Sequence, residues 1–185
     1  SEALPDDERN ALLARMTDEV GRMVLADNYF QTQSLAVSGQ RGEKMLDAQG
    51  RYIRHLEKAG RLNRAVEFLP GDEELVERKS RHIGLVSPER AVLLSYSKME
   101  LYDQLLASEL VDDDYLVPTL TGYFPRVLGV RYSEAMKRHP LRREIIATVL
   151  ANGTVNRSGS VFIHRMREET GASGPEVVRA YMLAT

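Results

Sequence analysis

The sequence predicts an all-α domain built around one buried central helix, and three observations lead to this fold class. Apolar residues recur at helical spacing, proline and glycine signals separate the segments, and no alternating strand pattern flanked by hairpin turns appears. We expect about eight helices in an irregular multi-helix arrangement, joined by short loops, without an internal repeat. A chain of 185 residues can form one such core, so we assign residues 1–185 to a single helical domain.

The composition is that of an ordinary globular protein, with 43% hydrophobic and 28% charged residues. The formal net charge of -2 supplies no global basic field for nucleic acid or a membrane surface. No cysteine is present, which excludes disulfides, thiolate zinc sites and a cysteine nucleophile within this chain. The sequence contains no membrane-span-like apolar run and no signal-peptide pattern. We therefore expect a cytoplasmic protein with no nucleic-acid partner and no membrane partner.

The first helix is expected over 6–33, where Pro5 and the acidic residues that follow it favour a helix start. Its apolar stripe is interrupted by Asp27, with Asn28 and Gln31 beside it. The polar segment 27–33 is either a functional cluster at the inner end of the helix or a helix end that frays into solvent. Residues 37–42 are expected to form a small polar connection.

The second helix is expected over 43–59, with an apolar face and Gly60 as its C-terminal cap. A short turn or extended link over 62–69 should follow. Asp72 is then expected to cap a mostly polar surface helix that runs to about Arg81.

A strong helix is expected over 87–107, where Ser87 is the predicted capping residue and a proline follows it. Its two apolar stripes imply two packing partners. Asp103 lies inside one stripe, so its carboxylate needs a cation or several hydrogen-bond donors. The candidate cations are Arg142, Arg143 and Arg157, and no sequence rule selects among them.

The acidic run at 112–114 is interpreted as a helix cap rather than a metal site, because consecutive side chains point in different directions. The capped helix should begin near Tyr115, with Pro118 in its first turn. Another helix is expected over 125–138, in a basic region that extends to Arg143. That region could meet an acidic neighbour, but it carries no nucleic-acid-binding fold signature.

The central helix is expected over about 140–157, with Pro140 at its first position and Gly159 as its stop. It is apolar on most of its circumference, which is typical of a buried helix. Asn152 and Asn156 are exceptions, one turn apart on one side. Since a buried amide without a partner costs roughly 2–7 kcal/mol, we expect both to be hydrogen-bonded. They form either a satisfied structural pair or a contact to a segment from elsewhere in a larger protein.

Two short helices complete the prediction. The first covers 160–170 and closes at Gly171, and the second runs to Met182 after a capping box formed by Ser173 and Glu176.

The sequence lacks the motifs of a complete active site. Neither G-x-G-x-x-G nor G-x-x-x-x-G-K-S/T occurs, no G-x-S-x-G elbow is present, and the four histidines have no zinc-protease spacing. We therefore expect no catalytic residue, no bound cofactor and no metal in this chain. The polar residues left as candidates for an interface or a buried polar network are Asp27, Asn28, Gln31, Asp103, Arg142, Arg143, Asn152, Asn156 and Arg157.

Three long stretches resemble the large bacterial NAD-specific glutamate dehydrogenases. They are RNALLARMTDEVGRMVLADNYFQTQ, PERAVLLSYSKMELYDQLLASEL, and HPLRREIIATVLANGTVNRSG followed by EETGAS. The resemblance runs from Arg9 to the end of the chain. It implies a helical piece, C-terminal to the NAD-binding region, of a much larger enzyme that oxidises L-glutamate to 2-oxoglutarate and ammonia with NAD as the hydride acceptor. The family's catalytic lysines, catalytic aspartate and dinucleotide-binding glycines lie upstream, so none is assigned here.

The resemblance leaves three roles open. In the first, the chain packs on the catalytic region of the same polypeptide, positions domains or supports a homo-oligomer, with helix 6–33 as a connector. In the second, the segment 27–33 or the two asparagines contribute to the active-site cleft or its closure. In the third, the chain is a free-standing regulatory or nucleic-acid adaptor that uses the basic segment 126–143.

Overall fold

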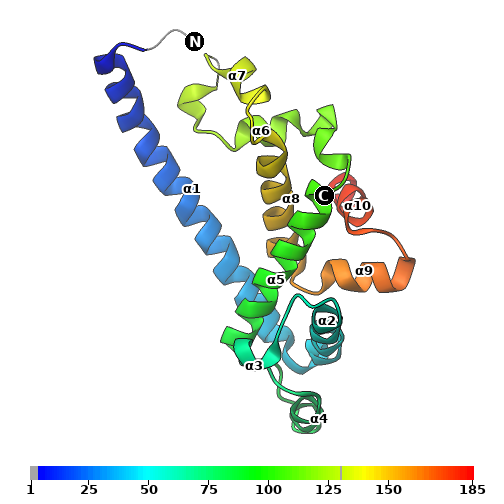
Figure 1. Cartoon of the computed structure of the whole chain (residues 1–185). Coiled ribbons are helices and arrows are strands. Elements are labelled where there is room, and N and C mark those ends of the chain that lie inside the picture. The colour runs from blue at the N-terminus through cyan, green and yellow to red at the C-terminus, as the bar shows by residue number, and fades with distance from the viewer. Residues whose placement is uncertain (1–3, 130) are drawn as a thin grey trace.

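The computed structural model describes residues 4–129 and 131–185, and these residues form an all-α fold without strands, which confirms the predicted fold class. α1 (Asp6–Arg41) runs along one side of the molecule, while α5 (Ser87–Leu106) and α8 (Arg142–Ser158) pack side by side at its centre (Figure 1). The remaining elements are η1 (Gly42–Met45), α2 (Leu46–Lys58), α3 (Arg64–Glu67), α4 (Asp72–Ser80), η2 (Leu110–Asp112), η3 (Asp114–Leu116), α6 (Val117–Gly122), η4 (Arg126–Leu128), α7 (Ser133–Lys137), α9 (Phe162–Thr170) and α10 (Gly174–Ala184).

The predicted central helix is confirmed as α8, which contacts α1, α5, α6 and α10. Its residues Ile146, Ala147 and Val155 are buried in a core shared with α5. A second core forms around α2, where Tyr52 and Ile53 are almost completely buried. Each large side chain buried in this way contributes about 1.5–3 kcal/mol. These two cores fix the positions of α8 and α2, which line the site described below together with α1.

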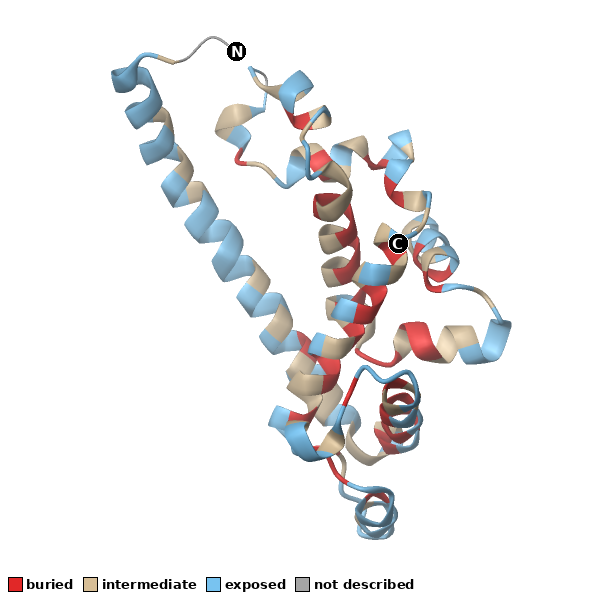
Figure 2. Cartoon of the chain, in the orientation of Figure 1, coloured by how far each residue is buried: buried red, intermediate tan, exposed pale blue. Residues whose placement is uncertain are grey.

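α1 is longer than the sequence predicted, because residues 37–42 do not form a separate connection. The helix continues to Arg41 since Ser34 is buried and Leu35 packs against the core shared by α5 and α8. It ends at Gly42, which has a φ of 40°. A Cβ at Gly84 would lie 2.6 Å from the Gly42 carbonyl carbon, so glycine at position 84 is required by this close approach. Most of α1 before Ser34 is exposed (Figure 2).

Several predicted helix starts differ from the observed ones by one or two residues. The N-cap of α5 is Val86 rather than Ser87, and the Glu89 carboxylate accepts the Val86 backbone N–H at 2.7 Å. Asp72 is the first residue of α4 instead of its cap, because its carboxylate accepts hydrogen bonds from Arg54 and Arg64, both at 3.0 Å.

The central helix begins at Arg142, so Pro140 is not its first residue. His139 Nδ1 accepts the Leu141 backbone N–H at 3.1 Å and holds the chain in a turn before the helix. The predicted stop is confirmed, because Gly159 has a φ of 91°.

The single helix predicted over 125–138 is wrong. The described residues form η4 and α7, and residue 130 of that prediction lies outside the described residues. The Gly129 N–H bonds to the Arg126 carbonyl three residues back, which closes a tight turn. Glycine in a helix interior also costs about 1 kcal/mol relative to alanine.

The capping box of Ser173 and Glu176 is confirmed at the start of α10, as is Gly171 at the end of α9. Asp113 caps η3 by accepting the Tyr115 backbone N–H at 3.0 Å, as the interpretation of the acidic run requires. Among the described residues, none of the helices has the length and apolar content needed to span a membrane.

Candidate functional site

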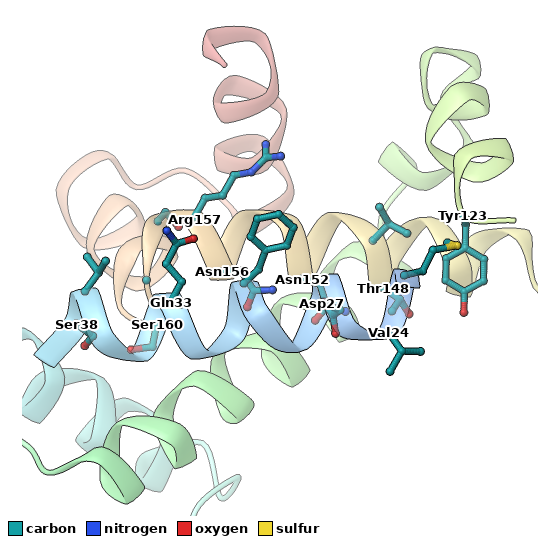
Figure 3. A pocket seen from close by; sticks show the side chains of 18 of the residues that line it. Val24, Asp27, Gln33, Ser38, Tyr123, Thr148, Asn152, Asn156, Arg157 and Ser160 are labelled. Atoms are coloured by element: carbon teal, nitrogen blue, oxygen red, sulfur yellow. The ribbon is translucent and has the colours of Figure 1, made fainter. Parts of the chain in front are cut away.

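A cavity of about 870 Å³, which we call the groove, lies between α1 and α8. The turn at 159–161 and α2 line one end, and residues 123–125 line the other. Figure 3 shows Asp27, Asn152 and Asn156 in the middle of this groove, with Tyr123 toward one end and Ser38 and Ser160 toward the other. The volume lies in the range of about 300–1,000 Å³ that is typical of binding sites.

The α1 wall of the groove carries apolar side chains at regular spacing among polar ones. Successive residues of a helix turn by about 100°, so positions three, four and seven apart lie on one side. Met23, Phe30 and Val37 follow this spacing and line the cavity, as do Val20 and Val24. Phe30 is 53% exposed and Val24 is 54% exposed, so the wall is open to solvent.

The α8 wall is polar and regular. Thr148, Asn152 and Asn156 line the cavity at intervals of four residues, which corresponds to about 6 Å per step along a helix. The Thr148 hydroxyl donates to the Glu144 carbonyl at 2.7 Å and is satisfied within the helix. Neither asparagine amide makes a hydrogen bond to a described residue, and Asn156 Oδ1 is buried without a partner. The expected hydrogen bonds of the two amides are therefore not formed with described residues, and a contact to a segment from elsewhere in a larger protein stays a prediction.

A third amide, Gln49 of α2, lines the same cavity. Gln49 is 2% exposed, and its Oε1 atom is buried without a partner among the described residues. This residue was not among the predicted candidates, although a signal was present in the sequence. Gln49 lies four residues after Met45 and four before Ile53, in the middle of the apolar face of its helix.

Asp27 provides the negative charge of the groove. Its Oδ2 accepts a hydrogen bond from Gln31 Nε2 at 2.7 Å. Burial lowers the pKa of the Lys98 amine on α5, and the Asp27 carboxylate acts against this shift. The structure thus brings Asp27, Asn152 and Asn156 together, and the functional role of this group stays a prediction.

The other candidate residues do not all join this group. Arg157 lines the cavity and is exposed, whereas Asn28 and Gln31 lie on α1 outside the cavity lining. Arg142 Nε is buried without a partner among the described residues. Arg143 is bonded to Asp112 and donates to the Leu106 carbonyl at 2.8 Å.

The cations predicted for Asp103 are wrong. Asp103 pairs with Arg61, which follows α2, and not with an arginine of α8. The side chains of Asp103 and Arg61 are 55% and 36% exposed, so this carboxylate lies near the surface rather than inside an apolar stripe.

A second polar cluster, missed by the sequence analysis, surrounds Glu100 at the junction of α2, α5 and α9. The Tyr52 hydroxyl donates to Glu100 Oε2 at 2.9 Å, and His55 Nε2 lies 2.9 Å from Oε1. Gln104 and Arg167 donate to the same Oε1 at 3.2 and 3.3 Å. Burial acts to raise the pKa of Glu100, but the hydrogen bonds from His55 and Tyr52 hold it below its ordinary value.

His164 lies beside this cluster, with its ring centroid 4.8 Å from that of His55. It is 8% exposed, and burial lowers the pKa of its imidazole below the ordinary value of 6.5. Its Nε2 makes no hydrogen bond to a described residue and lies 3.4 Å from the Glu168 carboxylate. In the part of the chain that the structure describes, no group of three or more histidine and acidic side chains is placed to hold a metal ion.

Two family models match this chain. Residues 82–185 match the model described as glutamate dehydrogenase, C-terminal, and residues 1–38 match the model described as bacterial NAD-glutamate dehydrogenase, catalytic domain. The second match ends inside α1, three residues before Arg41. The catalytic-domain match therefore ends within one continuous helix, whereas the C-terminal match begins at residue 82, just after α4.

Three relatives share the name NAD-specific glutamate dehydrogenase. The protein from Pseudomonas aeruginosa is 45% identical over 97% of this chain, that from Halomonas elongata 43% over 98%, and that from Mycobacterium tuberculosis 38% over 95%. The chain spans about 11% of the length of each of these relatives.

Proposed function

Because this chain belongs to the family described as glutamate dehydrogenase, C-terminal, we propose that it is a packing and positioning domain of a larger NAD-specific glutamate dehydrogenase. In this proposal the parent enzyme oxidises L-glutamate to 2-oxoglutarate and ammonia and transfers hydride to NAD. The chemistry takes place in the catalytic region of the same polypeptide, which binds and orients the cofactor.

The observation that carries this proposal is the exposed apolar surface of α1. Ser34 is the one buried residue among the 36 residues of this helix. Many exposed large apolar side chains on one helix favour an interaction site. The large apolar side chains exposed on α1 are Leu13, Val20, Met23, Val24, Leu25, Tyr29, Phe30 and Val37.

These side chains lie on two sides of the helix. At about 100° per residue, Leu25 and Tyr29 lie nearly opposite to the side that lines the cavity. They are 69% and 64% exposed. We name the side that carries Leu25 and Tyr29 the outer face of α1, and we propose that the catalytic region packs against it.

The position of α1 along the chain supports a positioning role. Its residues up to 38 fall in the match to the catalytic-domain model, while Ser34 and Leu35 anchor its C-terminal end to the helical core. A helix of this length extends about 54 Å at 1.5 Å per residue. Such a helix can therefore fix the orientation of the catalytic region relative to the helical core.

The test compares two tyrosines of nearly equal exposure in the full-length enzyme. Tyr29→Asp places a charge on the outer face of α1, while Tyr115→Asp changes a tyrosine that is 66% exposed on η3. We expect Tyr29→Asp to lower glutamate-dependent NADH formation or to change the native mass, and Tyr115→Asp to leave both near wild type. If Tyr29→Asp leaves both measurements unchanged, the packing role is wrong.

A direct contribution to the active-site cleft is the second candidate function. It is favoured by the meeting of Asp27, Asn152 and Asn156 at one cavity, beside a helix within the catalytic-domain match. This role predicts that Asn156→Ala changes the KM for glutamate or the kcat of the full-length enzyme while its thermal stability stays the same. A packing role predicts a loss of thermal stability instead.

The adaptor role has less support. Arg131, Lys137 and Arg143 belong to the basic segment 126–143, and each of these side chains is paired with an acidic residue. Their charge is therefore partly neutralised within the chain.

A further inference from the structure

We propose that the groove between α1 and α8 binds an extended segment of the catalytic region of the same polypeptide. The main-chain amides of that segment would pair with the side-chain amides of Asn152, Asn156 and Gln49. This inference rests on the proposed function and goes beyond it, because it names the groove, the conformation of the partner and the groups that bind it.

Unpaired amides of the groove favour a peptide main chain as the partner. Asn156 Oδ1 and Gln49 Oε1 are buried without a partner among the described residues, and Gln49 is 2% exposed. A buried acceptor without a donor destabilises the fold that contains it, so these atoms strongly favour a ligand that donates to them. A side-chain amide carries both a donor and an acceptor, and a peptide group offers the complementary pair.

The spacing of the amides favours an extended segment over a helix. Asn152 and Asn156 are four residues apart in α8, or about 6 Å along the helix axis. In an extended chain, every second residue repeats at about 6.6–6.8 Å. The two asparagines can therefore bond to alternate residues of one segment. A helix, by contrast, uses its own main-chain groups internally and leaves the groove amides without main-chain partners.

The α1 wall suits the side chains of such a segment. Alternate side chains of an extended chain point to opposite sides. One set can therefore contact Met23, Phe30 and Val37, which line the cavity from α1. The same contact covers Phe30, which is 53% exposed in this chain.

Two findings select the same polypeptide as the source of the segment. The α1 residues that form the apolar wall, up to Val37, lie within the match to a catalytic-domain model, and the chain spans about 11% of the length of its relatives. In a polypeptide as long as these relatives, the proposed segment and α1 would belong to one chain, so the segment would be covalently tethered to α1. A tether raises the local concentration of a segment to roughly the millimolar range, so a modest set of contacts suffices for binding.

Site-specific photo-cross-linking of the full-length enzyme tests this assignment. One variant carries p-benzoylphenylalanine in place of Phe30, on the groove side of α1, and a second carries it in place of Tyr29, on the outer face. Mass spectrometry then identifies the cross-linked peptides. We expect the Phe30 probe to capture a peptide of the same polypeptide that lies outside this 185-residue sequence.

The assignment is overturned if the Phe30 probe reaches only these 185 residues, reaches a second subunit, or captures nothing. The Tyr29 probe distinguishes a failure of the groove proposal from a failure of the proposed packing role. Capture of the catalytic region by the Tyr29 probe alone leaves the packing role intact and rejects the groove. Capture by neither probe rejects both.

A second set of variants tests the role of the amides. Asn152→Ala combined with Asn156→Ala should lower the cross-link yield of the Phe30 probe by about threefold or more, since each lost hydrogen bond is worth about 0.5–1.5 kcal/mol. The yield of the Tyr29 probe should stay unchanged. The matched control is Asn28→Ala. Asn28 is an exposed residue of α1 outside the cavity lining, so this substitution should alter neither yield. An unchanged Phe30 yield in the double variant contradicts the amide pairing.

Discussion

The Glu100 cluster and the α1–α8 groove place polar side chains against apolar helices in two different ways. Both carboxylate oxygens of Glu100 are occupied, by Tyr52 on one side and by His55, Gln104 and Arg167 on the other. In the groove, the amides of Asn156 and Gln49 each have a buried oxygen without a partner among the described residues.

We interpret this difference as one between a structural network and the binding surface proposed above. A buried carboxylate with a full set of donors stabilises the junction of the helices that supply them. Buried amides without partners destabilise the fold that contains them, and the cost is recovered when a partner binds. The two regions should therefore respond in opposite ways to the loss of their polar groups.

The largest expected effect is that of Glu100→Ala. This change leaves the Tyr52 hydroxyl buried without its acceptor and removes the carboxylate that faces His55 and Arg167. Breaking a buried charged network in this way costs about 3–5 kcal/mol, measured as the free energy of unfolding of the chain in urea. Glu100→Gln, which keeps one acceptor oxygen, should lose less. One net hydrogen bond contributes about 1 kcal/mol to the free energy of unfolding. If Glu100→Ala lowers the free energy of unfolding by less than about 1 kcal/mol, the contrast with the groove is lost.

The stability of the Glu100 region should also depend on pH. Burial lowers the pKa of His164 below 6.5, and the hydrogen bonds to Glu100 hold its pKa below 4.5 against the effect of burial. In both cases the unfolded chain binds protons at a higher pH than the folded chain does. The free energy of unfolding should therefore fall as the pH falls below 6.5, and fall again below 4.5.

Thermal unfolding across this pH range measures the effect. His164→Gln removes the imidazole and should flatten the first decline while leaving the second. If the thermal stability of the wild type rises as the pH drops through 6.5, this explanation is wrong.

Gln49→Met should have a small effect, in contrast to Glu100→Ala. Methionine has a similar shape and carries no unsatisfied amide oxygen, so the isolated chain should be unchanged or more stable by up to about 1 kcal/mol. In the full-length enzyme the same change should lower thermal stability, because the amide loses its proposed partner. A clear destabilisation of the isolated chain would show that Gln49 is already satisfied there.

The smallest effect is expected for Asp103→Asn. Its ion pair with Arg61 joins side chains that are 55% and 36% exposed, and such surface pairs contribute about 0.2–1 kcal/mol. Urea unfolding in low and high salt measures the change, which should shrink as salt screens the pair. A larger loss would mean that Asp103 belongs with the buried clusters.

Local signals in the sequence predicted much of the fold. The capping box at Ser173, the glycine stop at Gly159 and the apolar circumference of the central helix each depend on residues a few positions apart, and each is confirmed. The first helix was predicted too short, because the burial of Ser34 and Leu35 depends on packing against distant helices.

Contacts between distant residues were the part that the sequence could not supply. Arg61 and Asp103 are 42 residues apart, and His55 and Glu100 are 45 residues apart. No local pattern selects such partners from a chain in which 28% of residues are charged. The cluster nevertheless left a local trace, since Glu100 adjoins Leu101 and Leu105 on the buried side of α5. Asp27 and Asn152 were selected individually by their apolar surroundings, and the tertiary packing then placed both at one cavity.

The most direct test of the central claim is a cryo-EM structure of the full-length enzyme at a resolution that shows the main chain around α8. We predict an extended segment of the same polypeptide along Asn152 and Asn156, with main-chain groups within hydrogen-bond distance of their amides and of Gln49. An empty groove, or a groove filled by a helix that leaves these three amides unpaired, would contradict the claim.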